Sequence, residues 1–161
     1  MKIRIGFIVL LVVASTMLFA QVGGRGDSRV SNALDKIGLN YELDDDGDYQ
    51  LLYQYDDGRS QLVWVSGDTE DFYHVEVREV FSYAYDSDGV MPANVARTLL
   101  QANAGYKIGA WELRQSGSSS MGIFTARIDA DVDANTLKLI LEAVAVTADE
   151  MEKELLGTDE W

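Results

Sequence analysis

The residue types that carry most enzymatic and metal chemistry are scarce in this sequence. His74 is the single histidine and cysteine is absent, which argues against thiolate chemistry and against zinc sites built from several His or Cys ligands. A Ser-His-Asp triad needs a serine presented on a sharp turn, and the chain has no Gly-x-Ser-x-Gly motif. We expect His74 on the surface of a strand, on the opposite face from Val75 and Val77. We predict a protein that is not an enzyme and has no cofactor.

The acidic run between Glu42 and Asp48 has the composition of a calcium-binding loop. Asp44, Asp46 and Asp48 offer the oxygen ligands that calcium prefers. In an EF-hand pattern that begins at Glu42, however, Tyr53 stands at the twelfth position and cannot supply the bidentate carboxylate. The run also lies between predicted strands instead of helices. We interpret it as a solvated turn and keep the three aspartates as weak candidates for metal binding.

Two other patterns, an Arg-Gly-Asp tripeptide and pairs of carboxylates, are better explained by structure or chance than by function. Arg25-Gly26-Asp27 spells the tripeptide that integrins bind, but three-residue matches are frequent by chance. Asp27 or Ser28 also suits the N-cap of a first helix. The chain has 27 acidic residues, so carboxylate pairs at glycosidase spacing carry no information by themselves.

Residues 1–20 have the layout of a secretory signal peptide. Lys2 and Arg4 form a basic start, an apolar run follows, and Ala20 suits the position before the cleavage site. The apolar stretch is short for a membrane span, which needs about 20 residues. We therefore favour cleavage over an uncleaved membrane anchor. The prediction is an exported protein, periplasmic or extracellular, with no stable membrane association after signal removal and with a flexible leader at 21–27.

The strongly negative net charge limits which classes of partner the protein can bind. The formal net charge is −14, and loss of Lys2 and Arg4 from the 13 basic residues would leave 11 against 27 acidic ones, a net charge of −16. Such a surface repels nucleic acid and anionic lipid. It favours solubility or a basic partner, and the sequence leaves both interpretations open.

The remaining residues predict one α+β domain at 28–157, followed by a short tail at 158–161. Apolar spacing and capping residues predict a helix that ends at Gly38, a short helix that begins near Pro92, and a helix of about six turns between Asp133 and Gly157. The predicted strands are 49–55, 60–65, 72–85, 110–115 and 121–129, with a mobile connection at 116–120. The order α-β-β-β-α-β-β-α implies an antiparallel sheet of about five strands with helices on one face.

Two surfaces are predicted to contact other proteins. Leu99 and Leu100 lie on the short second helix, and Trp111 and Leu113 lie on a strand that we expect at the sheet edge. An uncovered apolar helix face and an unpaired edge strand both make a monomer prone to association. A two-fold interface would cover the helix face and pair the edge strand, which favours a homodimer. Aromatic residues also concentrate in the first three strands, where some must face the core and others an uncovered sheet face. Tyr53 and Tyr55 are the candidates for protein contacts there.

Four local features of the chain resemble the YbjN-like family, whose members share the fold of the small type III secretion chaperones. They are Gly38-Leu39-Asn40-Tyr41 with Asp46-Gly47-Asp48-Tyr49, then Gln61-Leu62-Val63-Trp64-Val65, then Leu99-Leu100-Gln101-Ala102-Asn103 with Gly109-Ala110-Trp111-Glu112-Leu113, and finally Ala145-Val146-Thr147-Ala148-Asp149-Glu150-Met151-Glu152. The resemblance covers about residues 28–157. It implies a type III secretion chaperone-like fold and a role as a sensory transduction regulator. The chaperones are acidic dimers that pair through the second helix and its neighbouring strand and bind an extended client segment. They act in the cytoplasm, whereas this chain carries an export signal.

Together these observations predict a non-catalytic, exported protein-binding module, chaperone-like or regulatory, with a protein partner of unknown identity. The alternative is a module in the periplasm that senses a small molecule or calcium through the sheet face or the acidic turn.

Overall fold

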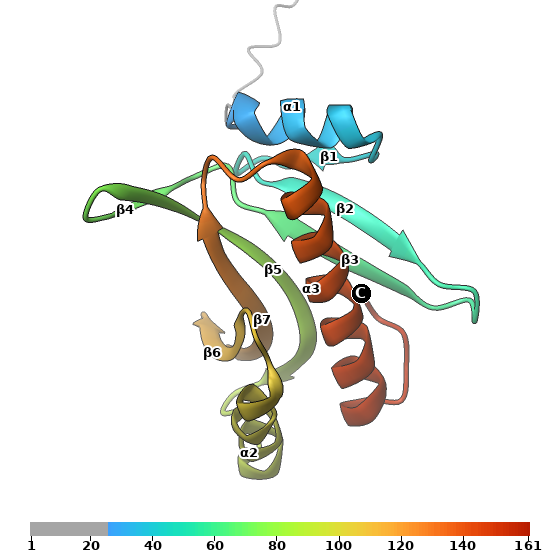
Figure 1. The fold of residues 1–161 in the computed structure, drawn as a ribbon. Helices are drawn as coiled ribbons and strands as arrows, with labels where there is room; N and C mark the ends of the chain where they lie inside the picture. The colour runs from blue at the N-terminus through green and yellow to red at the C-terminus, as the bar shows by residue number, and fades with distance from the viewer. Residues whose placement is uncertain (1–25) are drawn as a thin grey trace, which may run out of the picture.

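An antiparallel sheet and three α-helices form the framework of the protein (Figure 1). The computed structural model describes residues 26–161, so the predicted signal peptide and most of the predicted leader lie outside the described residues. The elements are α1 (Ser28–Ile37), β1 (Glu42–Leu43), β2 (Tyr49–Gln54), β3 (Ser60–Val65), β4 (Glu70–Phe72), β5 (Val75–Asp88), α2 (Ala93–Ala102), the 3-10 helix η1 (Asn103–Gly105), β6 (Ala110–Ser116), β7 (Ser119–Asp129) and α3 (Ala134–Leu155). Of the helices, α3 lies across one face of the sheet, while α1 packs against α3 and α2 packs against β6. The α+β class is confirmed.

The sheet has seven strands where the sequence predicts about five. Their order is β1-β2-β3-β5-β7-β6, and β4 pairs with β5 outside this path. The two additional strands, β1 and β4, contain two and three residues. Strands of this length are too short to show the alternation of apolar and polar residues by which a strand is recognised in a sequence.

The predicted third strand at 72–85 is wrong at its beginning. Phe72 belongs to β4, which turns at Tyr73 and His74 into β5 and pairs with it through Asp71 and Glu76. Tyr73 has φ 57°, in the left-handed region that tight turns use. His74 therefore lies exposed in a turn instead of on a strand face. Apolar and polar residues keep alternating through Tyr73 and His74, so the sequence pattern does not show that the chain reverses direction there.

The predicted mobile connection at 116–120 is a tight hairpin. Ser116 pairs with Ser119, so two residues make the turn, and Gly117 supplies its φ of 60°. Ser120 is buried, and its hydroxyl donates to the carbonyl oxygen of Gly89 at 2.5 Å. The hairpin is therefore part of the packed structure.

One face of the sheet and the inner sides of the helices make the core. Asp133 caps α3 by accepting from the backbone amides of Asn135 and Thr136. The predicted apolar face of α3 is confirmed as buried, and α1 and α2 add to the same core. Core residues of the three helices are Val30, Leu34, Val95, Leu99, Leu137, Leu141, Val144, Ala148 and Met151, and those of the sheet include Leu51, Val63, Val65, Val80, Ala84, Phe124, Ala126 and Ile128.

The other sheet face, here called the open face, has no helix packed on it. Because successive side chains of a strand point to opposite faces, the neighbours of the core residues lie there. They include Gln50, Leu52, Leu62, Trp64, Glu79, Phe81, Tyr83, Glu112, Arg114, Thr125 and Arg127. In residues 26–161, no helix is long and apolar enough to cross a membrane.

Candidate functional site

Four residues predicted to contact protein lie around one groove between α2 and β6. Leu99 and Leu100 from α2 face Trp111 and Leu113 from β6 across a hollow of about 220 Å³. This α2–β6 groove is completed by Met91, Ala96 and Glu112. The tertiary structure thus brings together two predicted pairs that are at least 11 residues apart in the chain (Leu100 to Trp111).

The four residues differ in how much surface they offer. Leu99 and Trp111 are 4% and 6% exposed and belong to the core, whereas Leu100 is 73% and Leu113 50% exposed. Leu99 packs against Gly122, where an added Cβ would lie 2.8 Å from the Leu99 Cδ1 atom. Apolar contact with another molecule therefore depends on Leu100 and Leu113.

The outer edge of β6 is closed at one residue and open beyond it. The Asn103 side chain donates from Nδ2 to the Trp111 carbonyl oxygen at 3.2 Å and accepts from the Trp111 amide at Oδ1 over 2.7 Å. One carboxamide thus replaces a neighbouring strand at Trp111. Because β-strand backbone groups alternate in direction, the amides and carbonyls of Leu113 and Gln115 also point outward, and no strand of the described residues pairs with them. In the sequence, Asn103 stands out only as the last residue of the motif Leu99-Leu100-Gln101-Ala102-Asn103.

Tyr53 and Tyr55 lie on the covered side of the sheet. Tyr53 packs against the core beside Glu142 of α3, and Tyr55 lies beside Asp149. Burial raises the pKa of Tyr53 to about 12 and also raises that of Tyr55. The expectation that Tyr53 and Tyr55 lie on an uncovered face of the sheet is therefore wrong.

The aromatic residues of the open face form a different set, which we call the aromatic cluster: Trp64, Phe81 and Tyr83. The rings of Trp64 and Phe81 stack with centroids 5.7 Å apart, and Tyr83 meets Trp64 edge-on at 5.1 Å. The Arg114 guanidinium lies 5.7 Å from the centroid of the Phe81 ring. Phe81 is only 8% exposed, so any contact with a ligand depends on the partly exposed rings of Trp64 and Tyr83, which combine apolar area with a hydrogen-bonding group.

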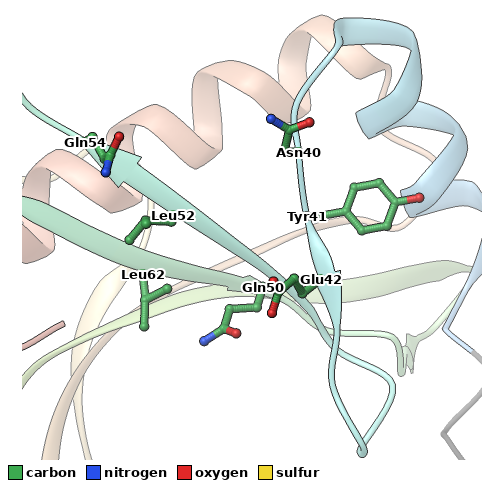
Figure 2. Close-up of a pocket in the computed structure, with 7 residues that line it drawn as sticks. All are labelled: Asn40, Tyr41, Glu42, Gln50, Leu52, Gln54 and Leu62. Atoms are coloured by element: carbon green, nitrogen blue, oxygen red, sulfur yellow. The ribbon is translucent and has the colours of Figure 1, made fainter.

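A second hollow, of about 450 Å³, lies beside the aromatic cluster on the open face. Figure 2 shows Gln50, Leu52, Gln54 and Leu62 on β2 and β3, with Asn40 and Glu42 on the segment across from them. Its lining mixes carboxamides and a carboxylate with two leucines. The volume and the lining suit a small polar molecule.

The predicted calcium candidates hold the acidic turn together. Asp44 Oδ1 accepts from the amides of Asp46 and Asp48 at 3.0 and 2.9 Å. Asp48 Oδ1 accepts from the Gly67 amide at 2.8 Å and so joins this turn to the one after β3. Burial raises the pKa of the Asp48 carboxyl. Two of the three aspartates therefore have structural partners on the protein backbone.

A closer group of carboxylates lies at the end of α3. Asp149, Glu152 and Asp159 come within 4.8 Å of one another, but Arg59 stands between them. Its guanidinium is 2.6 Å from Asp149, 3.0 Å from Glu152 and 3.9 Å from Asp159. The Glu152 side chain is fully buried, and burial raises its pKa. Arg59 thus supplies the positive charge that a metal ion would supply, and the group is an ion-pair cluster.

Comparison with known proteins supports the resemblance noted in the sequence. The model of a family described as "YbjN: Putative bacterial sensory transduction regulator" matches residues 27–157. Among solved structures, the chain is similar to the crystal structure titled "YbjN, a putative transcription regulator from E. coli", with 9% identity, a TM-score of 0.45, and coverage of 83% of this chain and 92% of that one. No curated protein matches the sequence.

Proposed function

Since the chain belongs to the YbjN family, described as putative bacterial sensory transduction regulators, we propose that it is a non-catalytic, exported protein-binding module whose contact surface is the α2–β6 groove. The observation that carries this function is the exposure of Leu100 and Leu113 on either side of the groove. Val90 and Ile108, which flank α2 in the sequence, are 85% and 44% exposed. Exposed apolar groups such as Leu100 and Leu113 beside an unpaired strand edge are typical of a protein interface.

The occupant that fits this groove best is a second copy of the chain. A two-fold axis through the outer edge of β6 would set Leu113 and Gln115 of one copy against the same residues of the other. The open backbone groups of both edges would then be paired, and the two Leu100 side chains would be removed from water. Asn103 closes the edge at Trp111 and so limits how far the strands can overlap.

Leu100→Asp should weaken self-association at least tenfold, because the interface would have to bury an unpaired carboxylate; tenfold corresponds to about 1.4 kcal/mol. Sedimentation equilibrium of the mature protein should show a dimer at micromolar concentration that tightens with added salt, since salt screens the repulsion between acidic copies. Leu139→Asp is the matched control, because Leu139 is 66% exposed on α3, away from the groove. Leu99→Asp is unsuitable, because Leu99 is a core residue.

A monomer at every concentration and salt level would contradict this interface. Equal weakening by the substitutions at Leu100 and Leu139 would also contradict it, because a change in surface charge alone would then explain the effect.

Export is part of the proposed function and has its own test. The basic start, apolar run and Ala20 support cleavage after residue 20. N-terminal sequencing of the protein from its native host should find a soluble chain that begins near Gln21. An intact Met1 in the membrane fraction would instead establish an uncleaved anchor.

A second candidate function, sensing of a small polar molecule, is favoured by the hollow on the open face. Its volume of about 450 Å³ and its mixed lining of Gln50, Gln54, Leu52 and Leu62 support this candidate. It does not involve the α2–β6 groove, so Leu100→Asp would leave it intact.

A further inference from the structure

Residues 157–161 fold back against the sheet after α3 ends. Gly157 has φ 69° and reverses the direction of the chain, and Figure 1 shows the following segment running back beside α3 toward β3. Residues 158–160 are exposed, whereas Trp161 is half-buried. The Trp161 ring stacks on Tyr83 of the aromatic cluster with centroids 5.2 Å apart. The segment predicted as a short tail therefore has a defined place.

Four hydrogen bonds hold the backbone and one carboxylate of this segment; in one of them the Ser60 hydroxyl donates to Asp159 Oδ2 at 3.5 Å. Arg59 Nη1 donates to the Thr158 carbonyl oxygen at 2.7 Å, and the Glu160 amide donates to Glu152 Oε1 at 2.6 Å. The Ser60 amide donates to Asp159 Oδ1 at 3.1 Å. The bonds to the Thr158 carbonyl and from the Glu160 amide involve only backbone groups of the segment, so they could form with any residue there. The contacts of Ser60 with Asp159, with the Arg59 charge 3.9 Å away, favour an acidic side chain. Together with the stacking contact, they recognise an aromatic residue two positions after an aspartate.

The groups that receive the segment are positioned by the rest of the domain. Arg59 is held by Asp149 and Glu152, and Tyr83 is held edge-on by Trp64. β3 pairs with β5 at Trp64 and Val65 but not at Ser60, so the Ser60 amide is free of the sheet on that side. A site already assembled in this way loses little conformational freedom when a ligand binds.

The segment also leaves one of its own groups unsatisfied. The indole Nε1 of Trp161 is buried, and no acceptor in residues 26–161 lies within reach of it. A buried donor without a partner opposes docking. A segment that is exposed at residues 157–160 and keeps a buried donor unsatisfied can therefore exchange with a similar segment from another molecule.

We propose that Arg59, Ser60, Glu152 and Tyr83 form a binding site for peptide segments in which an aromatic residue follows acidic residues, and that residues 157–161 occupy this site in cis. The partner class is an exposed acidic-aromatic segment of another protein, which binds after it displaces Trp161. The site is independent of the α2–β6 groove, and Leu100→Asp leaves its binding unchanged.

Fluorescence anisotropy with the labelled peptide Gly-Thr-Asp-Glu-Trp tests this proposal. A tethered segment competes at an effective concentration on the order of 1 mM, so Trp161→Ala should bind the probe about tenfold or more tightly than the unaltered chain. A chain that ends after Leu156 should bind it at least as well. A probe with alanine in place of tryptophan should bind neither. In the Trp161→Ala background, Tyr83→Ala should abolish binding, whereas Phe72→Ala, at an aromatic residue that is 63% exposed on β4, should not.

Equal affinity of the unaltered and Trp161→Ala chains for the probe would overturn the proposal. So would absence of binding to Trp161→Ala while its circular dichroism remains that of the folded protein. Equal effects of Tyr83→Ala and Phe72→Ala would show that the probe binds elsewhere.

Discussion

Asp27→Ala should lower the free energy of unfolding by about 3 to 5 kcal/mol, because it removes the partner of a buried arginine. The Arg78 side chain is 2% exposed, and its Nη2 atom lies 2.5 Å from Asp27 Oδ2. Arg78 also donates to the carbonyl oxygen of Ser66. Without Asp27, the guanidinium would remain buried with a carbonyl group but no counter-charge. The same carboxylate caps α1 by accepting from the Arg29 amide at 2.9 Å, so the helix would lose its cap as well.

Urea denaturation of Asp27→Ala and Asp131→Ala would compare the loss of stability when a buried ion pair is broken with the loss when an exposed one is broken. Asp131 also pairs with Arg29, at 3.0 Å, but its side chain is 73% exposed. We expect Asp131→Ala to change the free energy of unfolding by less than about 1 kcal/mol. Similar losses in the two variants would contradict the role assigned to Arg78.

The effect of Asp27→Ala should depend on pH. Hydrogen bonds from Arg29 and then from Arg78 hold the pKa of the Asp27 carboxyl well below its usual value of 3.8. A lowered pKa contributes stability that is present above the unfolded pKa and is lost as pH falls toward the folded one. The difference between the unaltered chain and Asp27→Ala should therefore be largest at neutral pH and should shrink below about pH 4.

Arg59→Ala should be the second strongly destabilising substitution, again by about 3 to 5 kcal/mol at neutral pH. Arg59 is 12% exposed and lies among Asp149, Glu152 and Asp159, and the Glu152 side chain is fully buried. Removal of the guanidinium would leave three neighbouring carboxylates without a counter-charge. Lys153→Ala is the matched control, since its pair with Asp57 spans 3.8 Å between exposed side chains. It should cost less than about 1 kcal/mol.

Acid should partly rescue Arg59→Ala. Burial already raises the pKa of Glu152, and loss of Arg59 removes an interaction that lowers it. A raised pKa in an acidic group means that stability is lost as pH rises through the folded value and is recovered below it. Urea denaturation from pH 7 down to pH 4.5, the usual pKa of a glutamate, should show the difference from the unaltered chain narrowing. A difference that stays constant or widens over this range would contradict the charge-based explanation.

The periodic and capped elements of the fold follow from local sequence. Gly38 ends α1 with a φ of 69°, and Asp133 begins α3. The residues spaced along the apolar face of α3 are buried, as their period requires. The family resemblance also rested on local motifs, and the match over residues 27–157 confirms it. In the candidate site, Leu99, Leu100, Trp111 and Leu113 were predicted from sequence because an apolar helix followed by an apolar strand is a local pattern, and the structure places them around one groove.

The tertiary structure decided which of those residues are available and which distant residues they meet. Alternation in a strand defines two faces but not which face the helices cover, so Tyr53 and Tyr55 could not be distinguished from Trp64 and Tyr83 by sequence. Leu99 and Leu100 are adjacent in sequence, yet one is in the core and the other is exposed. Arg59 and Glu152 are 93 residues apart, and Arg78 and Asp27 are 51 apart. No local pattern specifies such pairs, because their partners meet only when the whole sheet and α3 have packed together.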